Sequence, residues 1–370
     1  MIYSIDSIRH LHLEISSLCN AACPLCPRNF SGYPHNAGYV EHNMTLQEAQ
    51  KIFPVEFIQQ LDRMIINGNF GDMIMNPETV GICRYFLEHN PDLPISISTN
   101  GGARSTDFWR ELAELGVEVV FCIDGIDNAT HALYRQNTLY STVMRNAETF
   151  ISAGGYAIWK MIDFEHNHHQ IPEARIISID KGFSGFLLVD DGRDNGPVYN
   201  INGDLSHVIG SSKLGFTPSQ RIEPALEGPT SQRFKHRGLA IWLKEIPVSN
   251  ITCEVKQSLS VYISSTGDVF PCCYIGLNPA SYRNNSVIGY SMEQIAQLIS
   301  NNNALEHGLA TCIEWFNQIE KTWDIPTFEQ GRLITCNQTC GGPSRLDSFH
   351  VKNATYTDNI SKSQIQGSAT

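Results

Sequence analysis

Apolar and polar positions repeat with two different periods along residues 11–190 of the chain. Runs with every second position apolar, such as Leu11-His12-Leu13-Glu14-Ile15-Ser16, predict strands, whereas apolar residues three and four positions apart predict helices. The predicted strands span residues 11–16, 63–67, 95–99, 117–123, 157–164 and 186–189. The predicted helices span residues 45–60, 77–89, 106–115, 140–153 and 171–181. This alternation predicts an α/β fold with a parallel sheet and helices outside it.

The ends of several predicted helices carry recognisable signals. Thr45 and Glu48 form a potential capping box at the start of the helix 45–60, and Pro54 should kink that helix or split it in two. Gly116 should stop the helix 106–115, because glycine adopts the left-handed conformation that commonly follows a helix.

The rest of the chain divides into three further parts. Residues 191–250 are rich in Gly, Asp, Asn, Pro and Ser, so we expect a linker or covering loops that contribute to a substrate site. Periodicity resumes in residues 251–345, with a predicted hairpin of strands 259–264 and 268–272 and helices 292–299 and 305–323. Residues 346–370 are predicted to be a mobile polar tail. Residues 1–190 would then form the core domain.

Three cysteines directly follow the first predicted strand. Cys19, Cys23 and Cys26 have the spacing CxxxCxxC. Three thiolates on a four-iron cluster leave one iron without a protein ligand, so another molecule can bind there. Structural zinc is an alternative, although a structural zinc site usually has four ligands that come from pairs of cysteines. Three unrelated thiols in the hydrophobic core are a second alternative.

This cysteine motif resembles the signature of the radical S-adenosylmethionine (radical SAM) enzymes. The resemblance implies that Cys19, Cys23 and Cys26 hold a [4Fe–4S] cluster whose fourth iron binds S-adenosyl-L-methionine, with Leu25 in contact with the cofactor. An electron, delivered by an external flavodoxin- or ferredoxin-type donor, cleaves that cofactor to a 5′-deoxyadenosyl radical, which takes a hydrogen atom from the substrate. The family's fold is a partial (β/α)6 TIM-like barrel, which the six predicted strands match.

Segments after the second and third predicted strands resemble cofactor-binding regions of the same family. The turn containing Gly68, Asn69, Gly71 and Asp72 resembles the Gly-Gly-Glu region, which implies that its backbone and the Asp72 carboxylate hold the amino group of S-adenosylmethionine. The segment Thr99-Asn100 resembles the Thr-Asn-Gly segment near the ribose. Ordinary glycine-containing turns are the alternative for both segments.

The fourth predicted strand leads into Cys122, Asp124, His131 and Arg135. This order resembles the Phe-Ser-Ile-Asp-Gly…His…Tyr-Arg pattern of peptide-modifying relatives, which implies cofactor contacts from Cys122 and Asp124. Cys122 stands where this pattern has serine. Its thiol would be a weaker hydrogen-bond partner for the cofactor than a hydroxyl group, or it only fills the hydrophobic core. The resemblance assigns Arg135 to the cofactor carboxylate, a role that suits the two-pronged guanidinium.

The fifth predicted strand leads into a histidine-rich segment. His166, His168 and His169 would supply too few ligands on one face for a closed metal site, so we expect a solvated loop or the start of a helix. Asp163 and Glu165 are candidates for the substrate side of the site.

A second cysteine set lies in residues 251–345. The pattern Cys…Gly-x4-Cys…Cys-x3-Cys resembles the twitch subdomain, a small α+β cluster-binding domain, and implies that Cys253, Cys272, Cys336 and Cys340 hold an auxiliary [4Fe–4S] cluster. Zinc in the same positions is the main alternative, and Cys273 could replace Cys272. The remaining thiols of Cys83 and Cys312, in helical patterns, are predicted to be core residues.

Composition and charge narrow the function classes. The 370 residues carry a net charge of −12 without a basic cluster, so nucleic-acid binding is not predicted. An odd number of cysteines, 11, favours metal ligation in a reducing compartment over disulfides. No signal peptide or apolar run long enough for a membrane span occurs, so we expect a cytoplasmic protein.

The sequence thus predicts a radical SAM enzyme with an auxiliary cluster, acting on a small molecule or a peptide. Peptide-modifying relatives often carry an N-terminal recognition domain, whereas about ten residues precede the first predicted strand here, which weakens a peptide substrate without excluding it. The alternatives are a non-catalytic iron–sulfur electron carrier and a zinc-stapled binding protein.

Overall fold

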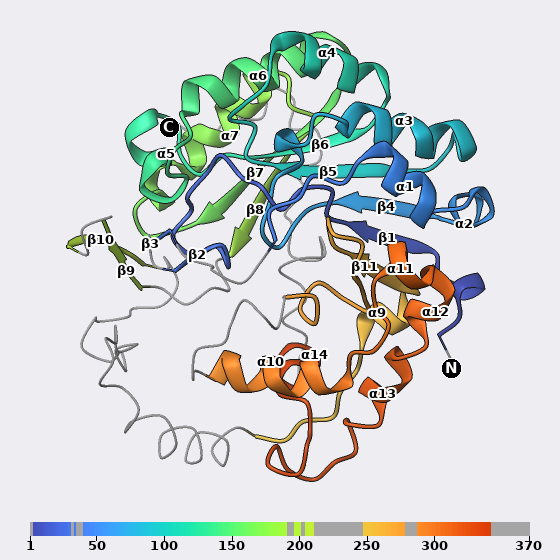
Figure 1. Cartoon of the computed structure of the whole chain (residues 1–370). Helices are drawn as coiled ribbons and strands as arrows, with labels where there is room; N and C mark the ends of the chain where they lie inside the picture. Colours follow the sequence, from blue (N-terminus) through green and yellow to red (C-terminus); the bar gives the residue numbers. More distant parts are fainter. Residues whose placement is uncertain are drawn as a thin grey trace.

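The computed structural model describes residues 3–30, 33–34, 40–190, 196–200, 204–210, 247–277 and 287–341. Six strands run parallel and neighbour one another in chain order: β1 (His10–Leu13), β4 (Arg63–Ile66), β5 (Ile95–Thr99), β6 (Glu118–Cys122), β7 (Tyr156–Asp163) and β8 (Gly185–Asp190). The helices between them are α1 (Leu46–Ile52), α2 (Val55–Gln59), α3 (Thr79–His89), α4 (Thr106–Glu114), α5 (Asn128–Tyr134), α6 (Tyr140–Ser152) and α7 (Ile171–Asp180). The predicted parallel α/β architecture is confirmed, with these helices on one side of the sheet and the C-terminal elements on the other (Figure 1).

The C-terminal hairpin extends this sheet beyond β1. Strand β11 (Ser260–Ile263) pairs in parallel with β1, and β12 (Val269–Phe270) pairs antiparallel with β11. The predicted hairpin therefore forms, and Gly267 supplies its turn with a positive φ of 84°. This hairpin lies in residues 251–345, yet its strands belong to the same sheet as the core strands.

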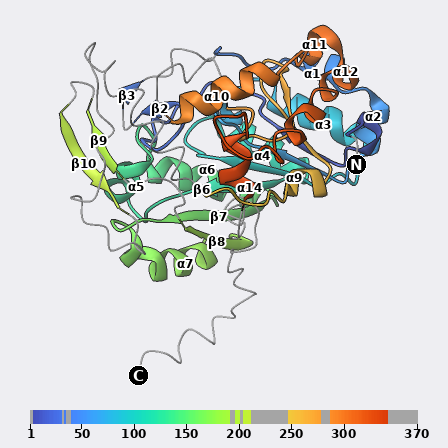
Figure 2. The same ribbon diagram turned by 90° about the horizontal axis from the view of Figure 1, so that it is seen from below.

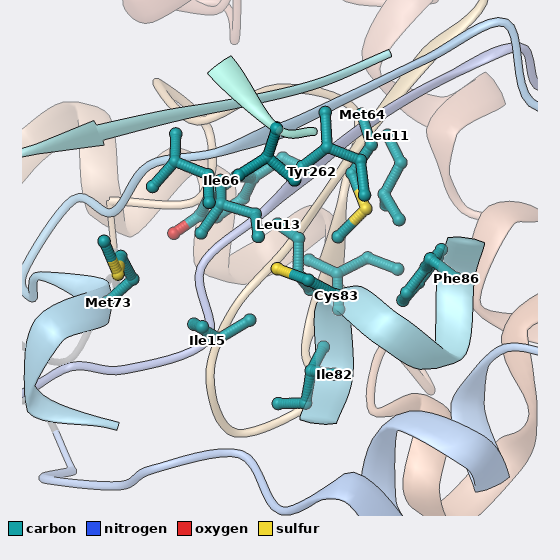
Figure 3. Close-up of a cluster of buried hydrophobic side chains, with 14 of the residues drawn as sticks. Leu11, Leu13, Ile15, Met64, Ile66, Met73, Ile82, Cys83, Phe86 and Tyr262 are labelled. Atoms are coloured by element: carbon teal, nitrogen blue, oxygen red, sulfur yellow. The ribbon is translucent and has the colours of Figure 1, made fainter. Parts of the chain in front are cut away.

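Apolar side chains fill the space between the sheet and α3. Leu11 and Leu13 of β1 lie beside Met64 of β4, and Cys83 of α3 points toward them (Figure 3). Cys83 and Cys312 are fully buried within this core, as the helical patterns predict.

Local signals place two of the helix boundaries. Thr45 Oγ1 accepts a hydrogen bond from Glu48 N (3.1 Å), and Glu48 Oε2 accepts one from Thr45 N (2.7 Å), which completes the predicted capping box. Pro54 splits the predicted helix, because α1 ends at Ile52 and α2 begins at Val55.

The C-terminal helices are shorter than the pattern predicts. Residues 305–323 were expected to form one helix but form parts of three, α11 (Ala304–His307), α12 (Leu309–Ile313) and α13 (Phe316–Glu320), because Gly308 interrupts them with a φ of 76°. The other elements of this part are α9 (Glu254–Gln257), α10 (Val287–Leu298) and α14 (Ile334–Cys340). The described residues also contain three short 3₁₀ helices: η1 (Ile5–Ser7), η2 (Met73–Met75) and η3 (His168–Gln170).

Two small antiparallel hairpins in the described residues lie outside the main sheet. They are β2 (Asn29–Phe30) with β3 (Tyr33–Pro34) and β9 (Gly196–Tyr199) with β10 (Leu205–Ile209). A hydrogen bond of 2.8 Å joins His207 Nε2 to the carbonyl oxygen of Leu133, and Figures 1 and 2 both place the β9–β10 hairpin beside α5. The other covering residues, 211–246, and the predicted tail lie outside the described residues. In the described parts of the chain, no helix has the length and apolar character that crossing a membrane requires.

Candidate functional site

The first cysteine set lies in the loop that leaves the carboxyl end of β1. The loop is held by hydrogen bonds from Cys26 N to Cys23 O (3.1 Å) and from Ala22 N to Gln136 O (2.9 Å). Cys23 is buried, and Cys19, Leu25 and Cys26 pack against the same small apolar cluster. The buried members of that cluster are Ala21, Cys23, Tyr134, Ile162, Phe164, Val198 and Ile209. Strands β9 and β10 supply the last two, so the β9–β10 hairpin helps to enclose the loop.

Two nitrogen donors approach the sulfurs of this loop. Asn100 Nδ2 lies 3.7 Å from Cys19 Sγ, and Arg135 Nη1 lies 3.8 Å from Cys23 Sγ. Burial, followed by the charge of Asp72 and those of the neighbouring cysteines, raises the pKa of Cys19. Cationic and amide donors beside thiols would stabilise the thiolate ligands of an iron–sulfur cluster. The residues present therefore fit a cluster held by Cys19, Cys23 and Cys26.

Asp72 is turned toward the loop that follows β5. Its Oδ1 accepts hydrogen bonds from Thr99 Oγ1 (2.7 Å) and Ile74 N (3.2 Å), and its Oδ2 accepts from Asn100 N and Nδ2 (both 2.7 Å). Four donors match the acceptor sites that a carboxylate offers. The structure thus brings the predicted residues Asp72, Thr99 and Asn100 together, but through contacts with one another.

The glycines of the loop after β4 allow a close approach to β1. A Cβ at Gly68 would lie 2.4 Å from Glu14 Oε1, and one at Gly71 would lie 1.9 Å from the Ser16 carbonyl oxygen. Glu14 Oε1 accepts hydrogen bonds from Phe70 N (2.8 Å) and Gly71 N (2.9 Å). Glu14 was not predicted as a site residue. The signal that could have identified it is an acidic side chain inside a pattern typical of a strand.

An ion pair organises the segment after β6. Arg135 Nε donates to Asp124 Oδ2 (2.6 Å), while Asp124 Oδ1 accepts from Ile162 N (2.7 Å). His131 supports this pair, because its Nδ1 accepts from Asp124 N (3.3 Å). Burial opposes the charged form of Arg135, but the Asp124 carboxylate outweighs it and raises the pKa of Arg135. Cys122 is buried at the end of β6.

The histidine-rich segment does not gather its side chains at one point. His168 Nδ1 lies 2.8 Å from Asp163 Oδ1, whereas His166 stacks on Phe164 with ring centroids 5.2 Å apart. His168 and His169 are exposed at η3, in agreement with the expected helix start. In the part of the chain that the structure describes, no three His, Cys, Asp or Glu side chains are placed to share a single metal ion.

The second cysteine set lines one cavity, here called the distal cavity. Its wall includes Cys253, Cys272, Cys336 and Cys340, which come from three segments: the start of α9, the residues after β12, and α14. A hydrogen bond with Cys340 lowers the pKa of Cys253 to about 7, whereas burial raises the pKa of Cys272. Four thiols in the wall of one cavity could together bind a metal, which would hold them as thiolates.

Cys273 lies outside the wall of the distal cavity. Its carbonyl oxygen accepts a hydrogen bond from Asn69 Nδ2 (2.8 Å), and its pKa is raised to about 12, first by burial and further by the charge of Glu14. The geometry therefore favours Cys272 over Cys273 as the companion of Cys253. It also shows that Asn69, a predicted cofactor residue, contacts the C-terminal part of the chain.

Comparisons with known proteins extend these observations. No protein-family model matches the chain. It is 23% identical over 346 residues to the tungsten-containing aldehyde ferredoxin oxidoreductase cofactor-modifying protein of Pyrococcus furiosus, an alignment that covers 86% of each chain. SuiB of Streptococcus suis, bound to precursor peptide SuiA, matches with a TM-score of 0.51 at 14% identity, over 88% of this chain and 67% of SuiB. The S-adenosylmethionine complex of SuiB matches with a TM-score of 0.50 at 13% identity, over 88% and 68%.

The chain has the fold of the radical SAM enzymes. The resemblance stated from the cysteine motif is thereby confirmed at the level of the fold. In this fold the cysteine loop after β1, the Asn100 loop after β5 and the Asp124–Arg135 pair after β6 all lie at the carboxyl ends of parallel strands, where such sheets carry their sites.

Acid should destabilise the protein through His131. Burial lowers the pKa of His131 to about 4, against 6.5 in an unfolded chain; Asp124 and Asp127 oppose this shift and Arg135 adds to it. The unfolded chain then binds more protons between these values, so stability is complete above pH 6.5 and is lost as the pH falls toward 4. We expect His131→Gln to remove up to about 3 kcal/mol of this pH dependence, measured by denaturant unfolding across that range. Equal pH slopes in both proteins would contradict the assignment.

Proposed function

We propose that the protein is a radical SAM enzyme whose reactive [4Fe–4S] cluster is held by Cys19, Cys23 and Cys26. The observation that carries the proposal is the placement of these thiols after β1 of a radical SAM fold, with Asn100 and Arg135 donors 3.7 and 3.8 Å from two of the sulfurs. When bound, the cluster supplies the electron that cleaves S-adenosylmethionine to the hydrogen-abstracting 5′-deoxyadenosyl radical.

Arg135 is the residue best suited to position the cofactor carboxylate. Asp124, which is completely buried, holds the guanidinium through Nε, and Tyr134 supports it with its ring centroid 5.1 Å from Cζ. A guanidinium fixed on one edge can offer its remaining N–H groups to a carboxylate without losing much conformational freedom. We infer that Arg135 binds the cofactor carboxylate beside Cys23. Leu25, Gly68, Asn69 and Cys122 remain proposed cofactor contacts.

Asp72 is better suited to a supporting role. Because its oxygens already accept four hydrogen bonds, it holds Thr99 and Asn100 in place around the cysteine loop. Asn100 Nδ2 also donates to Asn20 Oδ1 (2.9 Å), next to Cys19. These contacts support a preorganised loop in which Cys19 and the predicted ribose-side residues keep a fixed spacing.

The substrate is proposed to be a small molecule or a peptide, and the electron donor a flavodoxin or ferredoxin. Similarity to a cofactor-modifying protein supports the first substrate class, and similarity to the peptide-bound SuiB structure supports the second. Asp163 and Glu165, at the end of β7, are the proposed substrate-side carboxylates.

Replacing any cysteine of the first set should abolish cofactor cleavage. In Cys19→Ala, Cys23→Ala or Cys26→Ala, the cluster loses one of three protein ligands, so reduced protein should form no 5′-deoxyadenosine in a chromatographic assay. Cys312→Ala is the matched control, because Cys312 is a buried thiol that belongs to neither cysteine set and does not line the distal cavity, so its replacement should leave cleavage intact. Cleavage at the wild-type rate in Cys23→Ala would refute the assignment.

Replacing Arg135 should weaken binding of S-adenosylmethionine. Loss of a charge-assisted hydrogen bond costs about 1.5–3 kcal/mol, so we expect the Kd of Arg135→Ala to rise roughly 10- to 150-fold, measured by calorimetry on the reconstituted protein. Arg135→Lys should restore only part of the affinity, because the fork is lost. Arg110→Ala, which removes an exposed arginine paired with Asp107, should bind normally. An unchanged Kd in Arg135→Ala would show that another group holds the carboxylate.

We further propose that Cys253, Cys272, Cys336 and Cys340 ligate an auxiliary [4Fe–4S] cluster. Their convergence on the distal cavity supports this, and a cluster with four protein ligands is suited to accept an electron from a substrate radical. Such a role would favour a net oxidation.

The iron content separates the two proposed clusters. Anaerobically reconstituted protein should contain about eight irons, and the Cys19/Cys23/Cys26→Ala triple variant should retain about four. Elemental analysis gives both numbers. Zinc without iron in the triple variant would instead identify the distal cavity as a structural zinc site.

A further inference from the structure

The distal cavity contains polar atoms that no described residue satisfies. Besides the four cysteines, its wall includes Tyr3, Trp323 and Glu320, and Tyr3 Oη, Trp323 Nε1 and Glu320 Oε1 are buried without a hydrogen-bond partner. A buried polar atom left unpaired costs about 1–3 kcal/mol, and most such atoms in proteins are paired. Three such atoms in the wall of one cavity leave hydrogen-bonding capacity that an occupant of the cavity could use.

Tyr3 lines the same wall as Cys253 and Cys272. Tyr3 is 9% exposed, and its ring packs edge-on against Phe316 with centroids 5.3 Å apart. Its hydroxyl oxygen is buried in that wall without a hydrogen-bond partner. The start of the chain therefore reaches into the second cysteine site.

Trp323 lines the same wall as Cys336. Lys256 Nζ lies 5.9 Å from the ring centroid and the same ammonium pairs with Glu320 Oε2 at 2.5 Å, which fixes the indole from one side. The indole Nε1 is a donor only, and it is buried in this wall without a hydrogen-bond partner, so it can donate to a sulfur.

We propose that Tyr3 and Trp323 donate hydrogen bonds to sulfur atoms of the auxiliary cluster and make that cluster easier to reduce. The inference rests on the proposed auxiliary cluster and deepens it. Donors near the sulfurs disperse the negative charge that arrives with an electron, so they raise the reduction potential. The two residues would thus tune the site as an electron acceptor while leaving ligation to the four cysteines.

Glu320 offers a competing partner for Tyr3. Its Oε1 is buried and unpaired, and it can accept the Tyr3 hydroxyl hydrogen but has none to donate to sulfur. If Tyr3 donates to Glu320, removing the hydroxyl leaves the sulfurs unaffected. The test below distinguishes these two arrangements.

The experiment uses the full chain with the Cys19/Cys23/Cys26→Ala background, so that only the auxiliary cluster is present. Tyr3→Phe and Trp323→Phe keep an aromatic ring and remove one donor each. We expect each change to lower the midpoint potential of the cluster by about 59 mV, measured by an electron-paramagnetic-resonance titration. For a one-electron reduction this equals about a tenfold change in the equilibrium constant. Each should also remove one exchangeable proton from the electron–nuclear double-resonance spectrum of the reduced cluster.

The matched control is Trp315→Phe. Trp315 Nε1 is also buried without a partner, but Trp315 does not line the distal cavity, so its replacement should leave potential and spectrum unchanged. If both test variants contain four irons and show an unaltered potential and proton spectrum, this inference is wrong, although the auxiliary cluster is present. Absence of iron in the parent triple variant would overturn the auxiliary cluster itself.

Discussion

The buried carboxylate of Glu14 is the contact on which both cysteine regions depend. From β1 it accepts hydrogen bonds from Phe70 N and Gly71 N of the loop after β4, and from the Tyr262 hydroxyl of β11. Glu14 is 1% exposed, and burial raises its pKa. Losing any of these donors would leave a buried acceptor unpaired, so the carboxylate forces the loop and the C-terminal strand to stay together.

The loop after β4 consequently belongs to both proposed sites. On one side Asp72 orders Asn100 beside Cys19, and on the other Asn69 binds the Cys273 carbonyl next to Cys272. The spacing between the cysteine sets is therefore set by a strand pair and a short loop rather than by a hinge. Rigid spacing suits electron exchange, because the protein need not reorganise to bring the partners together.

The sequence predicts what depends on local burial and misses what depends on distant partners. Strand 95–99, the Thr45 cap and the break at Pro54 follow from neighbouring residues. The alternating pattern assigns Glu14 to a polar face, yet Tyr262 and the loop after β4 cover that face. No sequence signal near residues 260–263 predicts that this strand pairs with β1. Tyr3 precedes every periodic segment, so no pattern predicts that it lines the distal cavity.

The parallel pairing of β1 with β11 has a consequence for biosynthesis. His10 lies opposite Ser260, so β1 is synthesised long before one of its two partners. Until β11 emerges from the ribosome, one edge of β1 has unpaired backbone groups and is open to pairing with other chains. Closing this contact is slow, because partners so far apart in sequence meet rarely. The nascent protein therefore depends on the emergence of residues 260–263 before both edges of its first strand are protected.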